Sequence, residues 1–132
     1  MVKFDTGVLS KEEIESMLNT LPVDVTFVDK DDTVRYFSQP AKGRIFPRTK
    51  AVIGLNVRNC HPKKSLHKVE QILRDFKSKK RDSAEFWIKV KNRLIYIRYF
   101  AVRGKGGGYL GCLEVTQDIT AIQKIRGEKR LL

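Results

Sequence analysis

Hydrophobic residues near the start of the chain recur at three- and four-residue intervals, which places them on one face of a helix: Ile14, Met17, Leu18 and Leu21. Ser10 and Glu13 form the Ser-x-x-Glu capping box that begins a helix, and Pro22 ends it. We therefore expect an N-terminal amphipathic helix within residues 1–22.

Five later segments have the short, apolar-rich or alternating patterns of β-strands, namely 23–28, 34–37, 84–90, 94–102 and 109–117. Short polar or glycine-rich connections join 23–28 to 34–37, 84–90 to 94–102, and 94–102 to 109–117. Such short connections favour antiparallel pairing of the segments that they join. The segment 94–102 is apolar on both faces apart from Arg98, so we expect both faces to be covered.

A long helix is predicted after Pro62, and its apolar residues share one stripe: Leu66, Val69, Ile72, Leu73 and Phe76. In residues 38–62 the hydrophobic positions follow no regular spacing, and we predict short helical turns there. Ile122 and Ile125 predict a further helix over 121–132. The fold class is therefore α+β: a core over 23–120 with a five-stranded antiparallel sheet and helices on one face, flanked by the two terminal helices.

The net charge of +12 is concentrated in residues 42–81, which carry 13 basic and 2 acidic residues. Such a segment attracts nucleic acid, an anionic ligand or an acidic partner, or it is a solvated helical surface. Nucleic acid is the weakest of these predictions, because only Phe46 and Phe76 could stack on bases and Phe76 belongs to the apolar stripe.

The chain has no apolar signal segment and no run long enough to span a bilayer, so we expect a cytoplasmic protein with no membrane association. Cys60 and Cys112 are far apart and are expected to stay reduced. With His61 and His67 they lack the paired spacing of a zinc site, and no metal is expected. Nucleotide-binding and nucleophile motifs do not occur, and we expect no catalytic activity.

Three local motifs resemble those of PAS domains. Residues 52–57 resemble the stretch with a central glycine before the long helix, and His61-Pro62 resembles the start of that helix. Tyr109-Leu110-Gly111 followed by Gln117-Asp118-Ile119-Thr120 resembles the last strand and its exit. Several segments are also similar to the PAS-like domain that follows hemerythrin-like domains in some prokaryotic proteins. The chain would then be a stand-alone homologue or the terminal piece of a longer protein.

The resemblance implies a sensory or signalling module that binds a small ligand between the long helix and the sheet, or that binds none and dimerises. The pocket candidates are Tyr36, Phe46, Cys60, His61, Val69, Ile72, Leu73, Phe86, Ile88, Tyr96 and Arg98. Asp118, Ile119 and Thr120 would carry the signal to the C-terminal helix. Arg98 either pairs with Glu85 or Glu114 across the sheet or contacts an anion in the cavity.

The cofactor is unknown, and the resemblance is compatible with a domain that binds none. Haem is a secondary alternative through His61, because His67 falls on the polar side of the long helix. The residues around Cys60 lack the pattern of flavin-binding photosensory PAS domains. The partners we expect are a second copy of the chain and an unidentified small molecule or signalling protein. The homodimer would use the N-terminal helix and the outer face of the sheet.

Overall fold

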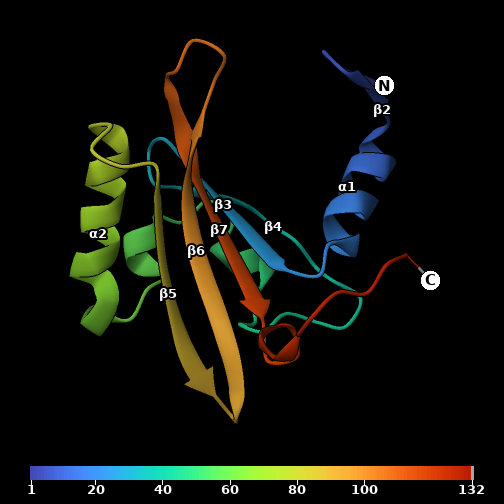
Figure 1. The fold of residues 1–132 in the computed structure, drawn as a ribbon. Helices are drawn as coiled ribbons and strands as arrows, with labels where there is room; N and C mark the ends of the chain where they lie inside the picture. Colours follow the sequence, from blue (N-terminus) through green and yellow to red (C-terminus); the bar gives the residue numbers. More distant parts are fainter. Residues whose placement is uncertain (132) are drawn as a thin grey trace.

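The computed structural model describes residues 1–131 and contains a five-stranded antiparallel sheet in the order β4-β3-β7-β6-β5 (Figure 1). Its strands are β3 (Asp24–Asp29), β4 (Val34–Phe37), β5 (Ser83–Val90), β6 (Arg93–Arg103) and β7 (Tyr109–Asp118). All four neighbouring pairs are antiparallel. The α+β fold and the five-stranded sheet predicted from the alternating pattern are confirmed.

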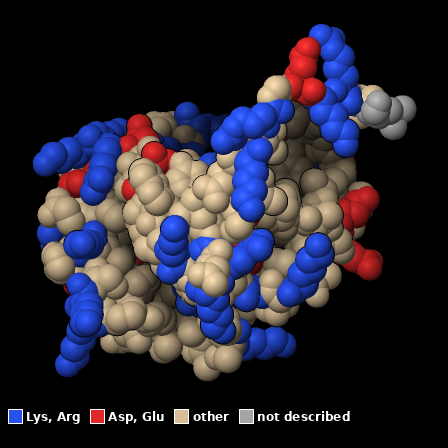
Figure 2. Space-filling view, turned by 60° about the horizontal axis from the view of Figure 1, so that its bottom comes forward, with Lys and Arg blue, Asp and Glu red and all other residues tan. Residues whose placement is uncertain are grey.

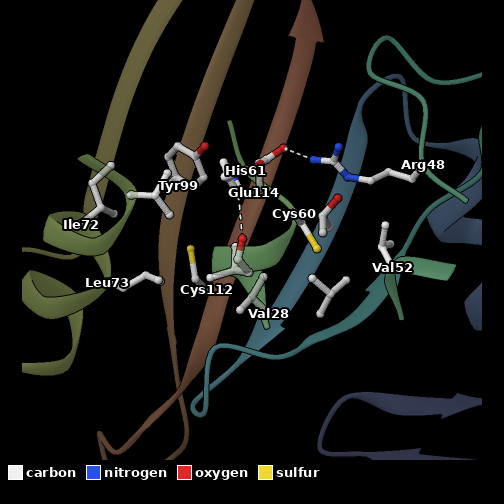
Figure 3. A pocket seen from close by; sticks show the side chains of 14 residues that line it. Val28, Arg48, Val52, Cys60, His61, Ile72, Leu73, Tyr99, Cys112 and Glu114 are labelled. Atoms are coloured by element: carbon white, nitrogen blue, oxygen red, sulfur yellow. Dashed lines mark hydrogen bonds and ion pairs between the residues drawn. The ribbon is translucent and has the colours of Figure 1, made fainter. Parts of the chain in front are cut away.

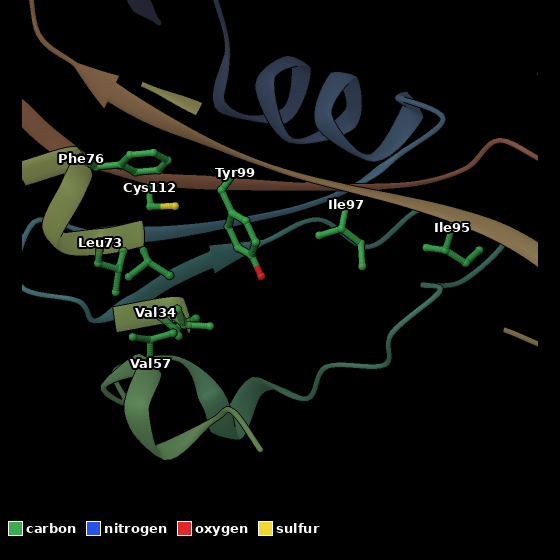
Figure 4. Close-up of a cluster of buried hydrophobic side chains, with 10 residues drawn as sticks. Val34, Val57, Leu73, Phe76, Ile95, Ile97, Tyr99 and Cys112 are labelled. Carbon is green, nitrogen blue, oxygen red and sulfur yellow. The ribbon is translucent and has the colours of Figure 1, made fainter. Parts of the chain in front are cut away.

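Helices cover one face of this sheet, which we call the inner face. They are α2 (Lys63–Lys77) and the 3-10 helices η1 (Lys50–Val52) and η2 (Val57–Asn59). The apolar stripe of α2 enters the core, where Leu73 is 3% exposed and Phe76 is fully buried (Figure 4). On the sheet side it meets Ile97 and Tyr99 of β6 and Cys112 of β7. The apolar residues that recur every three or four positions in α2 thus pack against those that alternate along the strands, and together they form one hydrophobic core.

The N-terminal helix α1 (Lys11–Thr20) begins at the predicted capping box. The Glu13 backbone N–H donates to Ser10 Oγ at 3.0 Å, and the Ser10 N–H donates to the Glu13 carboxylate at 2.8 Å. Before it, β1 (Val2–Phe4) and β2 (Gly7–Leu9) pair as a small hairpin, so the first residues of the 1–22 segment are not helical. No helix within residues 1–131 has the length and apolar content to cross a bilayer.

The C-terminal helix predicted over 121–132 is wrong for the residues that the structure describes, and Leu132 lies outside them. Only the 3-10 turn η3 (Ile122–Lys124) forms, and Gly127 has a positive φ of 63°. Ile125 is 69% exposed, so the two expected apolar residues bury little surface. A helix this short is marginal in water unless packing supports it, and here the packing is missing.

Gly111 in β7 allows the closest approach between β7 and β3. A Cβ at this position would lie 2.2 Å from the Val28 carbonyl oxygen and 2.7 Å from the Phe27 ring. Gly108 lies in the preceding loop, and a Cβ there would meet nothing within 4 Å. The glycine of the Tyr-Leu-Gly motif is therefore required by the packing of the sheet.

We predict that Gly111→Ala lowers the free energy of unfolding by about 3 kcal/mol, because the methyl group must push two central strands apart. Gly108→Ala is the matched control and should change it by no more than about 0.5 kcal/mol. Urea denaturation followed by circular dichroism measures both. Equal stability of the two variants would contradict the assigned packing.

Candidate functional site

A cavity lies between the inner face of the sheet and α2 (Figure 3). Val69, Ile72 and Leu73 of α2 form one wall, and the segment from η1 to α2 closes another side. The remaining lining residues come from the strands and from that segment: Thr26, Val28, Val34, Arg48, Val52, Val57, Cys60, His61, Tyr99, Cys112 and Glu114. The cavity is apolar except along one side, where Arg48, Glu114, His61 and the Tyr99 hydroxyl lie (Figure 3).

An ion pair forms the polar side of the cavity. Arg48 Nη2 lies 3.6 Å from Glu114 Oε1, and the two side chains are only 23% and 11% exposed. Glu114 projects from β7, whereas Arg48 belongs to the segment that precedes η1 (Figure 3). The pair therefore attaches this segment to the sheet. Breaking it would leave Glu114 charged in a mostly apolar surrounding, which is costly.

Tyr99 and Cys112 stand beside this carboxylate and remain protonated. Burial, reinforced by the negative charge of Glu114, raises the pKa of the Tyr99 hydroxyl far above its ordinary value. The same two causes raise the pKa of the Cys112 thiol to about 12. Tyr99 can therefore donate a hydrogen bond at neutral pH, while Cys112 is a packing residue rather than a nucleophile.

His61 reaches the cavity from the turn before α2. Its Nδ1 lies 3.3 Å from the Val57 carbonyl oxygen, and because a carbonyl oxygen only accepts, Nδ1 is the donor in this contact. Cys60 is half-buried, and its thiol donates to the Asn56 carbonyl oxygen at 3.7 Å. Both residues therefore line the cavity and also contact backbone carbonyl oxygens at the start of η2.

Five of the predicted pocket residues line this cavity together: Cys60, His61, Val69, Ile72 and Leu73. Phe46 packs against the core cluster without lining the cavity. Tyr36 lies elsewhere, in a groove beside β4. Phe86 and Ile88 share the inner face with Ile97 and Ile95 but stay 41% and 39% exposed. Their strand, β5, is at the edge of the sheet, and its end extends beyond α2 in Figure 1.

The placement of Tyr96 and Arg98 in the pocket is wrong. Along β6 the buried residues are Ile95, Ile97 and Tyr99, so Tyr96 and Arg98 face the opposite side of the sheet. There the Arg98 guanidinium lies 4.7 Å from the centre of the Tyr96 ring and donates to the Gln117 side chain at 3.3 Å. Because side chains alternate between the two faces of a strand, an error of one residue in the predicted register moves every side chain to the opposite face.

The two acidic partners considered for Arg98 bind other groups. Glu85 is opposite Arg98 in the register, but its carboxylate accepts a hydrogen bond from the Tyr96 hydroxyl. Glu114 pairs with Arg48 on the other face. Arg98 is therefore held by two rings and an amide rather than by an ion pair.

Sequence reasoning missed Tyr99, Glu114 and Arg48 as cavity residues. Glu114 carried a usable signal, because a carboxylate in the middle of an apolar strand needs a cation partner when it is buried. Nothing in the sequence identifies Arg48 as that partner among the basic residues of 42–81. The pairing depends on how the irregular segment folds over the sheet.

The free volume of the cavity is about 30 Å³, enough for one or two water molecules. Sites for cofactors of the size of haem or flavin enclose at least about 300 Å³. His61 lines the cavity, but the residues around it leave no room for a macrocycle. Haem and flavin therefore do not fit the cavity in this conformation.

Asp118, Ile119 and Thr120 make a tight corner at the end of β7. The Asp118 carboxylate accepts hydrogen bonds from the Thr120 hydroxyl at 2.6 Å, from the Thr120 N–H at 3.0 Å and from Arg93 at 2.7 Å. These contacts, those of Thr120 first, lower the Asp118 pKa to about 2. The Ile119 N–H donates to the Leu94 carbonyl oxygen, so the corner is tied to β6.

Figure 2 shows one face of the molecule, on which Lys and Arg side chains are interspersed with uncharged surface. Several cations of the basic segment 42–81 are used internally: Arg58 and Lys77 both contact Asp32, and Arg81 contacts Asp75. Pairing of this kind reduces the positive charge available to a nucleic-acid backbone. The prediction that nucleic acid is not a partner stays untested.

The order of strands, the helix on the inner face and the exit corner define the class of protein. A family profile described as a PAS domain matches residues 14–120. The chain belongs to the PAS domain family, a family of sensory and signalling modules that are generally non-catalytic. The closer resemblance to PAS-like domains that follow hemerythrin-like domains stays a prediction. No match was found among curated proteins.

Solved structures agree with this assignment. A C-terminal domain from Streptococcus mutans is 36% identical, with 95% of this chain and 96% of that one covered and a TM-score of 0.87. The PAS domain of BvgS from Bordetella pertussis is 14% identical over 83% of this chain and 85% of that one, with a TM-score of 0.61. A sensory box sensor histidine kinase from Vibrio cholerae is 12% identical over 81% and 90%, with a TM-score of 0.58. The last two show similarity of fold alone.

We predict that Arg48 and Glu114 stabilise the fold together. In a double-mutant cycle with Arg48→Met and Glu114→Gln, we expect a coupling free energy of about 1 kcal/mol, because the pair is largely shielded from water. The exposed pair of Arg130 and Glu128, 86% and 77% exposed, is the control. Its coupling should not exceed about 0.2 kcal/mol. Equal couplings measured by thermal unfolding would contradict a structural role for the inner pair.

Proposed function

We propose that this PAS domain is a non-catalytic sensor that binds a small molecule in the cavity against α2. The observation that carries the proposal is the combination of an apolar cavity with one polar side, which Arg48, Glu114 and the Tyr99 hydroxyl supply. Apolar walls give affinity, and a few convergent polar groups fix the orientation of a ligand.

The size of the cavity limits how such a ligand could bind. A free volume of about 30 Å³ admits only a very small molecule while the Arg48–Glu114 contact is closed. A larger ligand requires the segment carrying Arg48 and Val52 to move away from the sheet. Binding would then favour a second arrangement of this segment, which is how a ligand shifts a conformational equilibrium.

The Asp118–Thr120 corner is the proposed route of the signal. It lies at the end of β7, the strand that also carries Glu114. Because Asp118 contacts Arg93 and Ile119 contacts Leu94, a shift between β7 and β6 would change the corner. The chain after the corner packs little and would follow that change.

The test is native mass spectrometry of freshly purified protein together with its absorption spectrum. We expect the wild type to carry a mass excess that disappears in Ile72→Phe, because the added ring occupies the cavity wall. Ile125→Phe, at a 69% exposed site outside the cavity, is the control and should keep it. Circular dichroism verifies that both variants fold. No excess in any protein, or an excess that Ile72→Phe retains, would contradict ligand binding in the cavity.

A homodimerisation module is the second candidate, and the exposed apolar face of α1 favours it. None of the ten residues of α1 is buried, and Met17 and Leu21 are 56% and 45% exposed. The outer face of the sheet adds the half-buried Phe100 and the 62% exposed Trp87. An amphipathic helix and an apolar sheet face without cover suit a two-fold symmetric contact.

We predict that the protein is a dimer and that Met17→Glu makes it monomeric, because the new carboxylate would be buried in the contact. Lys11→Glu places the same group on an exposed position at the start of α1 and should leave the dimer intact. Light scattering coupled to size-exclusion chromatography measures the mass. A monomeric wild type would contradict this candidate without affecting the ligand proposal.

A further inference from the structure

A second, larger hollow lies outside the sheet-helix cavity, along the edge strand β4. Its volume is about 550 Å³, and its walls come from three separate parts of the chain. Glu15 and Asn19 belong to α1, and a second group of residues belongs to β4 and the turn after it. The third wall is the segment around η1. We call this hollow the β4 groove, and its lining residues are Glu15, Asn19, Arg35, Tyr36, Phe37, Gln39, Arg48, Lys50 and Ile53.

Positive charge predominates in the β4 groove. Arg35, Arg48 and Lys50 line it, against the single carboxylate of Glu15. Arg35 contacts Asp29 at 3.2 Å and Arg48 contacts Glu114 at 3.6 Å, whereas Lys50 has no ion pair with any residue between 1 and 131. A concave surface with excess positive charge favours an anion, and Lys50 is free to contact it.

A polar group without a partner is also found here. The Tyr36 hydroxyl is shielded from solvent and has no hydrogen-bond partner in residues 1–131. Burial and the nearby Glu15 carboxylate raise the Tyr36 pKa, so the hydroxyl keeps its proton and can donate. A ligand in the open groove cannot reach a hydroxyl that solvent does not reach, so Tyr36 contributes apolar surface to the groove rather than a donor.

The remaining walls are partly apolar. Phe37 lines the groove, and Ile53 is 43% exposed beside it. An inorganic anion would leave this surface uncovered, whereas an organic anion with an apolar body would bury it. We propose that the β4 groove binds a small organic anion, a carboxylate or phosphate ester on an apolar body, with Lys50 as its charged contact and Tyr36 and Phe37 among its apolar walls.

This site has a structural consequence for α1. The helix buries none of its own residues, and a hydrogen bond from the Gln39 N–H to the Asn19 side chain, 2.8 Å long, joins it to the turn after β4. An anion in the groove would contact α1 and the core at once and would fix the helix. Arg48 lines both the groove and the inner cavity, so the anion would also compete with Glu114 for it.

The test compares two probes with the same apolar body, phenylbutyrate and phenylbutanol, by NMR titration of the isotope-labelled full chain. At about 0.15 M ionic strength, where long-range attraction is screened, we expect the carboxylate to bind about fivefold more tightly than the alcohol. The shifted backbone amides should include those of Asn19, Gln39 and Ile53. Shifts confined to Val69, Leu73 and Tyr99 would place the probe in the inner cavity and overturn the groove proposal alone.

Matched variants separate specific binding from general attraction. Lys50→Gln should weaken phenylbutyrate about fivefold, and Tyr36→Phe, which keeps the ring, should change the affinity by less than about twofold. Lys124→Gln removes a cation outside the groove and should change the affinity by less than about twofold. Equal losses in Lys50→Gln and Lys124→Gln, equal binding of the two probes, or no binding of phenylbutyrate below about 10 mM would each overturn the proposal.

Discussion

Burial of one face of the sheet beneath α2 is the constraint on which the rest of the structure depends. Phe76 is fully buried and Leu73 nearly so, and both meet the odd-numbered residues of β6 and the even-numbered residues of β7. Once this face is buried, the strands can no longer shift by one residue without moving apolar groups into water. The same packing determines which side chains surround the cavity and which face outward.

The irregular segment between β4 and α2 then decides how open the cavity is. This segment contains little regular secondary structure, and specific contacts hold it in place, among them the ion pair of Arg48 with Glu114. Arg44 donates hydrogen bonds to the Ser38 carbonyl oxygen at 2.8 Å and to the Thr26 hydroxyl at 3.1 Å. Polar contacts of this kind can exchange for contacts with a ligand more easily than core packing can. The fold thus combines a fixed sheet and helix with a wall that polar contacts hold in place.

The two hollows meet at Arg48, which lines the apolar cavity on one side and the β4 groove on the other. The guanidinium is planar and carries five donors, so it can serve two acceptors in different directions. Its position places one charged group between the inner cavity and the groove that α1 borders.

The sequence by itself determined the local elements, because their signals act over a few residues. The capping box at Ser10 and Glu13, the stripe of α2 and the alternation of β7 all form as predicted. The close approach at Gly111 also explains a motif that could be identified before the structure was known. Resemblance to PAS domains added the family, whereas the order of the strands in the sheet came only from the structure.

Only the tertiary structure decided which faces and which distant residues form the sites. Strand β6 is apolar on both faces, so its pattern could not place Tyr96 and Arg98 outside and Tyr99 inside. The pairing of Arg48 with Glu114 joins residues far apart in the chain, and many cations could have served. Within residues 1–131 the C-terminal segment formed no long helix because Ile125 stays largely exposed, and packing is a property of the whole fold rather than of the segment.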